Sequence, residues 1–209
     1  AGVDVSCVRR SGETGTIVVL VDADGERSML TDRRSCVELA DPDPSWLDGV
    51  STLHVPLYSL VGGAIADTAS TLVGWSHDRE IAVSVDVSSS ALIESAGCDV
   101  VLALLERVRP RAVFANSDEA DVLSISSSIA GAVTVVKRGP DSALVYSPER
   151  TLHPVEVAPG TRFVGVDTTG AGDAFAAGFV TWPDWFDDPV GACGSGHEAA
   201  ERHLGAVSA

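Results

Sequence analysis

The sequence predicts an α/β fold with a mostly parallel central sheet, and three observations agree on this. From Ser51 onward, short β-branched segments alternate with helical stretches, as βαβ units require. The apolar fraction of 45% supplies a substantial core, which excludes an intrinsically disordered chain. The length of 209 residues fits one domain of ordinary size.

The first fifty residues are predicted to be β-rich and unlike the rest of the chain. Residues 16–21 (TIVVLV) form a β-branched run, residues 22–25 give a turn signal, and residues 26–31 can return as a second strand. The segment 41–44 (DPDP) stops this pattern and precedes a short helical piece that begins at Ser45. We therefore expect a lid or an edge sheet here rather than a part of the core.

From residue 51, the predicted strands and helices alternate along the chain. Strands are expected over 52–57, 81–87, 112–115, 132–136, 143–146, 152–157 and 163–166. Helices are expected over 63–75, 100–108, 118–123, 171–182 and 198–204. The helix from Ala171 has the clearest pattern, because its apolar residues recur at helical spacing up to Trp182.

Charge and cysteine usage limit the partners and the location. Fourteen basic and thirty acidic residues give a net charge of -16, which disfavours nucleic-acid and membrane partners. Four scattered cysteines, without a metal-ligand spacing, indicate reduced thiols. The apolar runs are too short to span a bilayer, and no basic-then-apolar leader opens the chain. These features predict a cytoplasmic protein.

The most informative segment is 167–175 (DTTGAGDAF), in which a strand is expected to lead through a Gly-rich turn into a helix. Small residues at 170–172 leave backbone N–H groups uncovered at the helix N-terminus, where the dipole attracts an anion. Asp173 would lie in the first turn, where its carboxylate can accept a proton from an attacking alcohol. Alternatively, Asp173 is only a favourable first-turn acid, and the glycines only permit close packing. Spacing alone leaves both interpretations open.

These residues and two companion motifs resemble the ribokinase-like (PfkB) family of sugar and nucleoside kinases. The segment 167–178 (DTTGAGDAFAAG) resembles the C-terminal signature of the family. The segment 116–119 (NSDE) resembles its N-x-x-E motif, and 137–139 (KRG) resembles its nucleotide-contacting turn. Residues 2–5 and the 16–31 hairpin resemble a part of its substrate lid.

The resemblance implies a ribokinase-like three-layer sandwich with a mostly parallel central sheet and a small, incomplete β lid. Residues 1–50 would form the partial lid and its connection, and residues 51–209 would form the α/β nucleotide-binding core. The family begins with a strand and sugar-contacting residues upstream of anything in this chain, so we expect the chain to lack the N-terminal part of the domain. Ser88 and Ser142 stand where many members carry Asn and Gly, respectively.

The resemblance also implies a phosphotransferase with an alcohol acceptor, and it gives roles to individual residues. Asp173 would be the general base, and Gly170, Ala171 and Gly172 would form an anion hole for the transferred phosphoryl group. ATP would be contacted by Asn116, Glu119, Lys137, Gly139 and Thr168, with Glu119 holding Mg²⁺ through water. Asp167 and the Thr169 carbonyl match a monovalent-cation site of the K⁺ type, which Gly205 and Ser208 would complete.

Each of these roles has a structural alternative. Asn116 and Glu119 could be a helix cap and a first-turn acid, and Lys137 could be a solvated charge at the end of a strand. The histidines at 54, 77, 153 and 203 are interpreted as surface or core residues rather than catalytic ones.

Four hypotheses for the function follow. The first is an ATP-dependent kinase that phosphorylates a hydroxyl of a sugar of the ribokinase or fructokinase type. The others are a nucleoside kinase of the adenosine type, a truncated or degenerate member that binds nucleotide without catalysis, and an unrelated α/β ligand-binding domain. The expected partners are ATP and a small sugar or nucleoside. A second copy of the chain is also expected, because lid hairpins of this family often mediate dimers.

Overall fold

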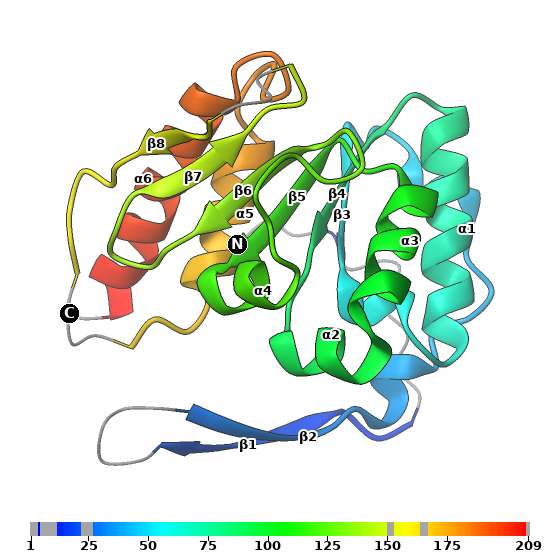
Figure 1. Cartoon of the computed structure of the whole chain (residues 1–209). Coiled ribbons are helices and arrows are strands. Elements are labelled where there is room, and N and C mark those ends of the chain that lie inside the picture. Colours follow the sequence, from blue (N-terminus) through cyan, green and yellow to red (C-terminus); the bar gives the residue numbers. More distant parts are fainter. Residues whose placement is uncertain (1–3, 5–11, 22–26, 150–152, 164–166, 208–209) are drawn as a thin grey trace.

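The structure is a computed structural model that describes residues 4, 12–21, 27–149, 153–163 and 167–207 (Figure 1). Its strands are β1 (Thr16–Val21), β2 (Arg27–Asp32), β3 (Thr52–Pro56), β4 (Ala82–Asp86), β5 (Ala112–Asn116), β6 (Val133–Lys137), β7 (Ala143–Tyr146) and β8 (Val155–Val157). Its α-helices are α1 (Ala64–Asp78), α2 (Ser90–Ala96), α3 (Cys98–Val108), α4 (Ser117–Val122), α5 (Ala171–Val180) and α6 (Pro189–Val207). Short 3₁₀ helices cover Arg34–Val37, Pro44–Leu47 and Leu57–Leu60.

A mixed, mostly parallel sheet forms the centre of the fold. In the described part of the chain its strands follow the order β3-β4-β5-β6-β7-β8. The strands from β3 to β6 run parallel, whereas β7 and β8 are added antiparallel. The register pairs Pro56 with Asp86 and Asn116 with Lys137, so the carboxyl ends of the parallel strands meet at one edge. The predicted α/β class with a mostly parallel sheet is confirmed.

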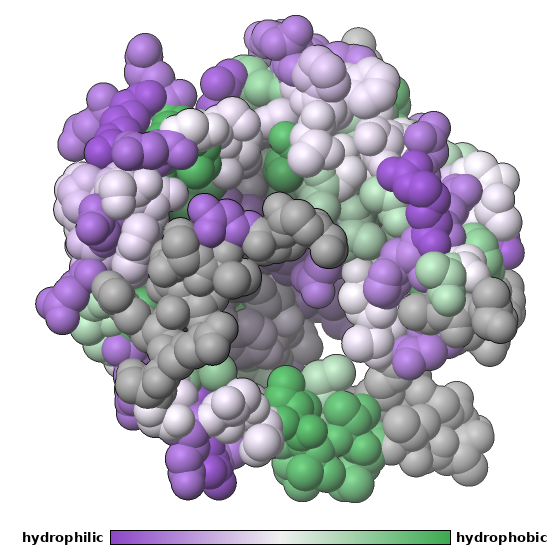
Figure 2. Space-filling model, turned by 180° about the vertical axis from the view of Figure 1, so that it is seen from behind, coloured by the Kyte–Doolittle hydropathy of each residue, from purple (hydrophilic) through white to green (hydrophobic). Residues whose placement is uncertain are grey.

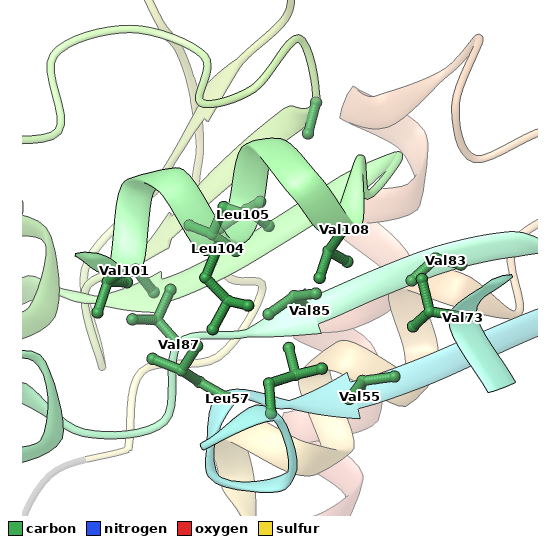
Figure 3. Packing of buried hydrophobic residues seen from close by; sticks show 14 of the residues in the cluster. Val55, Leu57, Val73, Val83, Val85, Val87, Val101, Leu104, Leu105 and Val108 are labelled. Atoms are coloured by element: carbon green, nitrogen blue, oxygen red, sulfur yellow. The ribbon is translucent and has the colours of Figure 1, made fainter. Parts of the chain in front are cut away.

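Helices cover both faces of this sheet and so produce three layers (Figure 1). On β5, Val113 and Ala115 belong to a core with α1 and α3, whereas Ala112 and Phe114 belong to a core with α5 and α6. This division follows from the pleat, because successive side chains of a strand point to opposite faces. Figure 3 shows the first core, in which valines of β3 and β4 meet apolar side chains of α1 and α3.

A separate antiparallel ribbon is formed by β1 and β2. Its strands match the predicted ones within a residue, while the predicted turn at 22–25 lies outside the described residues. The apolar side chains of this ribbon are exposed, and Val18 and Leu30, which pair across the strands, are 56% and 61% exposed. In Figure 2 they contribute to an apolar surface at the foot of the molecule. Such a surface is unusual for an isolated soluble domain and indicates a contact site.

The predicted length of α6 was wrong, and α2 was not predicted. The helix α6 spans Pro189–Val207, whereas only 198–204 was predicted, because its several glycines lower helix propensity. Packing of α6 against α5 compensates for this low helix propensity. A Cβ added at Gly178 would lie 2.6 Å from the Ala199 Cβ, and one at Gly196 would lie 3.0 Å from the Phe175 ring. The strand predicted over 163–166 falls mainly on residues outside the described part.

Two findings bear on the predicted location. Within the described residues, no helix is both long and apolar enough to cross a membrane. The described cysteines are free thiols: Cys36 is exposed, Cys98 is half-buried and Cys193 is buried. Burial raises the pKa of the Cys193 thiol to about 12, so this thiol stays protonated and unreactive. The cytoplasmic location stays a prediction.

The close contact of α5 with α6 predicts opposite effects of alanine at two glycines. Gly178→Ala should lower the free energy of unfolding by about 1–3 kcal/mol, because the added methyl group collides with Ala199 and the Ser195 backbone. Gly194→Ala, in α6, should raise it by about 0.5–1 kcal/mol, because nothing lies within 4 Å of the added Cβ. Urea denaturation of the two variants measures both. Equal effects would contradict the packing described for these helices.

Candidate active site

Three polar side chains stand at the ends of neighbouring parallel strands. Asp86, Asn116 and Lys137 are the last residues of β4, β5 and β6, respectively. Two residues before Asn116 and Lys137, Phe114 and Val135 pack in the core under α5 and α6. The alternation of strand side chains therefore places Asn116 and Lys137 on the face that α5 covers. In open α/β sheets, this carboxyl edge is where ligands bind.

Asp86 and Lys137 form a largely buried ion pair. The Lys137 Nζ donates to the Asp86 Oδ2 at 2.6 Å, and the side chains are 15% and 14% exposed. The other carboxylate oxygen accepts the Ser88 N–H at 2.9 Å. Ser88 has a φ of 69°, in the left-handed region that Asn adopts more readily than Ser. Asp86 belongs to none of the motifs and was not predicted as a site residue. Its place as an acid at the end of an apolar strand could have indicated a functional role.

The N-terminus of α5 lies beside this ion pair. A Cβ added at Gly172 would lie 3.3 Å from the Lys137 Nζ, so the helix start and the lysine are in near contact. Gly170 is the N-cap with a φ of 80°, and its carbonyl accepts the Ala174 N–H at 2.9 Å. The Ala171 N–H donates to the Thr168 carbonyl at 3.1 Å. The amides of Gly172 and Asp173 are first-turn donors, which the helix itself does not pair.

A surface pocket opens next to this helix start, and it is lined by three of the predicted nucleotide-contacting residues and two of the predicted anion-hole residues. They are Lys137, Gly139, Thr168, Ala171 and Gly172. Gly139 has a φ of 58°, so the turn that follows β6 depends on a residue without a side chain. The opposite wall comes from α6, through His197, Ala200, Glu201 and Leu204. The sequence predicted a helix over 198–204 but gave these residues no role, and His197 lies in the part of α6 that was not predicted.

Asn116 and Glu119 form a capping box at the start of α4. The Asn116 Oδ1 accepts the Glu119 N–H at 2.9 Å, and the Glu119 carboxylate accepts the Asn116 backbone N–H at 2.8 Å and its Nδ2 at 2.9 Å. Glu119 is 3% exposed. The interpretation of this pair as a helix cap and a first-turn acid is confirmed. Because both carboxylate oxygens already accept the hydrogen bonds of the cap, Glu119 would hold Mg²⁺ through water molecules and not as a direct ligand.

Burial raises the pKa of Glu119 above its ordinary value. The hydrogen bond from the Asn116 backbone opposes this shift, and the charge of Asp86 adds to it. The charge of Lys137 acts in the opposite direction to that of Asp86, so both members of the ion pair act on the Glu119 carboxyl group.

Asp173, in the first turn of α5, is exposed. His54, in β3, lies within electrostatic reach of Asp86, Lys137 and Asp173. Although the His54 side chain keeps an exposed surface, partial burial lowers its pKa, and the two carboxylates oppose that shift. The imidazole lies 6.0 Å from the Phe114 ring, between ring centroids. The His54 Nδ1 is 2.9 Å from the Ser84 hydroxyl. Sequence reasoning gave His54 no role, because nothing nearby in the sequence connects it with Asp173.

The residues predicted for a monovalent cation bond to donors of the chain itself. The Asp167 Oδ1 accepts the Thr169 N–H at 2.9 Å and its hydroxyl at 2.7 Å. The Thr169 carbonyl accepts a hydrogen bond from the His203 Nε2 at 2.7 Å. Gly205 lies in the last turn of α6, and Ser208 lies outside the described residues. Across the described part, no cluster of three or more His, Cys, Asp or Glu residues could hold a metal ion.

Comparisons with known proteins agree on one family. The family described as pfkB family carbohydrate kinase matches residues 1–204. An ATP-dependent ribose-1-phosphate kinase from Halopiger xanaduensis is 30% identical over 193 residues, which are 87% of this chain and 60% of that protein. The chain therefore spans about three fifths of the length of this curated relative.

Solved structures show the same fold. Adenosine kinase from Sinorhizobium meliloti superposes with a TM-score of 0.74 at 24% identity, covering 92% of this chain and 61% of that one. A putative ribokinase II from E. coli superposes with a TM-score of 0.64 at 23% identity, covering 81% and 58%. At this level of identity the likeness shows the fold alone. The ribokinase-like three-layer fold predicted from the sequence is thus confirmed.

The raised pKa of Glu119 predicts a pH-dependent stability difference. The folded chain holds the Glu119 proton to higher pH than the unfolded chain, in which the glutamate side chain has its ordinary pKa of 4.5. The stability that this group contributes is full below that value and falls as pH rises through the raised pKa. The stability advantage of the wild type over Glu119→Gln should therefore shrink from low to neutral pH. Urea denaturation across this range measures it, with exposed Glu106→Gln as the control. A constant or growing difference would contradict burial as the main cause.

Proposed function

Because the chain belongs to the pfkB family of carbohydrate kinases, we propose that the natural protein that carries it transfers the γ-phosphoryl group of ATP to a hydroxyl of a sugar. One observation carries this proposal: the N-terminus of α5, with Asp173 in its first turn, adjoins Lys137 at the mouth of a pocket. The pairing of a phosphate-binding helix end with a carboxylate is what phosphoryl transfer requires.

The phosphates of ATP would lie at the start of α5. The Gly172 and Asp173 amides and the helix dipole favour negative charge there, and the Lys137 ammonium adds a full positive charge. Ala171 and Gly170 keep the approach free of bulky side chains. Gly139 and Thr168 would border the nucleotide farther along the pocket, with α6 as the opposite wall.

The acceptor hydroxyl would lie on the side of Asp173. The carboxylate takes the hydroxyl proton as the oxygen attacks the γ-phosphorus, and the bond to the β-phosphate oxygen breaks as ADP leaves. Asp173 is exposed, so a substrate can reach it. The donors at Gly172 and Asp173 would face the charge that develops on the transferred group.

Bound Mg²⁺ would neutralise charge on the phosphates during transfer. Asn116 and Glu119 would orient its water shell, since Glu119 is buried and already accepts two hydrogen bonds. Asp86 would hold the Lys137 ammonium in place by their ion pair. In this arrangement the ion pair with Asp86 would position the Lys137 side chain, and the ammonium would supply positive charge next to the phosphates.

Three alternatives compete with this proposal. An adenosine-type acceptor is supported by the likeness to adenosine kinase structures, and a ribose-1-phosphate acceptor by the curated relative. A chain that binds nucleotide without catalysis is also consistent with the pocket beside Lys137. Assays with ribose, fructose, ribose-1-phosphate and adenosine separate the acceptors. Calorimetric titration with Mg-ATP separates binding without turnover from catalysis.

We also propose that the β1–β2 ribbon is a lid that pairs with the ribbon of a second copy. Val18, Leu20 and Leu30 share one face of the ribbon, while Ile17, Val19 and Met29 share the other. Apolar side chains on both faces of so thin a sheet can be covered only by two different neighbours. One of these faces would meet the substrate region, and the other would meet the partner copy.

Asp173→Asn should lower kcat roughly 10²–10⁴-fold, because the amide cannot take the hydroxyl proton. The affinity for Mg-ATP should stay near the wild-type value, since the first-turn amides and Lys137 are kept. Asp67→Asn is the matched control, because Asp67 is another exposed acid in the first turn of a helix. Steady-state kinetics of the natural full-length protein and titration with Mg-ATP measure the two effects. Turnover near the wild-type rate in Asp173→Asn would refute the proposed mechanism.

Leu30→Lys should convert a dimer into a monomer, because a charge at the centre of an apolar contact must be desolvated. Sedimentation velocity at several protein concentrations measures the change. Val190→Lys, at an exposed apolar residue of α6, should leave the assembly unchanged. If the wild-type protein sediments as a monomer at every concentration, the pairing of ribbons is excluded.

A further inference from the structure

The Thr169 carbonyl accepts a hydrogen bond from a histidine that lies 34 residues farther along the chain. The His203 Nε2 is 2.7 Å from this oxygen. A carbonyl oxygen can only accept, so the proton of this bond belongs to Nε2. His203 belongs to α6, which runs beside α5 in Figure 1. The contact thus joins one end of α6 to the turn that starts α5.

The second oxygen ligand expected for a cation is engaged in the same way. The Asp167 Oδ1 accepts both the N–H and the hydroxyl of Thr169, at 2.9 and 2.7 Å. A monovalent cation in this turn would need oxygen atoms that face an open position. Here the Asp167 Oδ1 already accepts two hydrogen bonds from the chain and the Thr169 carbonyl accepts one, so a cation would have to compete with these donors.

The residue that follows Thr169 is matched to the imidazole. A Cβ added at Gly170 would lie 3.0 Å from the His203 Nε2 and 3.2 Å from its Cε1. The φ of Gly170 is 80°, so the turn itself also favours glycine. A side chain at position 170 would crowd the imidazole, so glycine favours the approach of the histidine to the carbonyl.

The same helix holds a second loop of the pocket. The Glu201 Oε1 accepts the N–H groups of Gly160 and Thr161 at 2.7 and 3.0 Å, and Thr161 and Glu201 line the pocket. Two side chains of α6, two residues apart, therefore fix two loops at the nucleotide pocket. This makes α6 the anchor of the Gly-rich turn.

We propose that His203 takes the place of a monovalent cation in this protein. Its imidazole N–H fixes the Thr169 carbonyl and thereby the turn that presents the Gly172 and Asp173 amides. His203 is a positioning residue, and the site needs no K⁺. The effect on nucleotide affinity rests on the proposed function, whereas the hydrogen bond and the indifference to K⁺ do not.

Two measurements test the proposal without any catalysis. Long-range ¹H–¹⁵N spectra of the imidazole groups should show a proton on the His203 Nε2 that exchanges slowly with water and disappears in His203→Ala. The unfolding temperature of the wild type should be the same in KCl, NaCl and tetramethylammonium chloride at equal ionic strength. A proton on Nδ1 alone, or a stabilisation specific to K⁺, would overturn the proposal.

A third measurement tests the effect on the Gly-rich turn. His203→Ala should weaken Mg-ATP binding about tenfold in calorimetric titration, since one positioning hydrogen bond is lost. His203→Gln should recover most of the affinity, because the side-chain amide can donate to the same carbonyl. His77→Ala is the matched control: the His77 Nε2 bonds the Val108 carbonyl at 2.8 Å, far from the turn.

The outcomes of this titration distinguish a failure of the role proposed for His203 from a failure of the proposed function. Equal losses of affinity in His203→Ala and His77→Ala would show a general loss of stability and overturn the proposal. A wild-type protein that binds no Mg-ATP would refute the proposed function instead. The imidazole spectra and the salt series would then still decide the role of His203.

Discussion

The arrangement of the site depends on how closely α5 packs against α6. Gly178 and Gly196 remove the side chains that would keep the helices apart, since an added Cβ would meet Ala199 or Phe175 within 3.0 Å. This contact sets the position of α5 over the sheet. It brings Thr169, before the start of α5, next to His203 of α6. The start of α5 also meets the sheet, where Gly172 lies next to Lys137 of β6. A helix pair that approached less closely would lose the contact of Thr169 with His203.

The net charge of -16 and the proposed phosphate site are compatible because they act at different distances. Exposed charges farther away than about 8–10 Å are screened by salt, whereas the amides at the start of α5 and the Lys137 ammonium act at contact distance. The ion pair with Asp86 keeps Lys137 at the edge of the sheet instead of in solvent. The acidic surface therefore disfavours polyanions without opposing one bound nucleotide.

Local patterns in the sequence predicted the sheet and most helices, whereas contacts between distant residues escaped prediction. β-branched runs and apolar periodicity are short-range signals, so β4, β5, β6 and α5 were expected close to where they lie. The cap formed by Asn116 and Glu119 was also visible as an alternative, since its partners are three residues apart. The partnership of Asp86 with Lys137 joins residues 51 positions apart, and the glycines that hid α6 are favourable only because α5 is there.

The histidines show why residue type alone does not decide a role. His77 and His203 each place Nε2 against a backbone carbonyl, at 2.8 and 2.7 Å, and both were expected to be surface or core residues rather than catalytic ones. The His77 bond joins two helices on one face of the sheet, so its loss costs stability only. The His203 bond ends on the turn that carries Gly172 and Asp173, so its loss also changes where the first-turn amides point. The same type of hydrogen bond thus contributes only to stability at Val108, whereas at Thr169 it also positions the site. The location of the accepting carbonyl determines the difference.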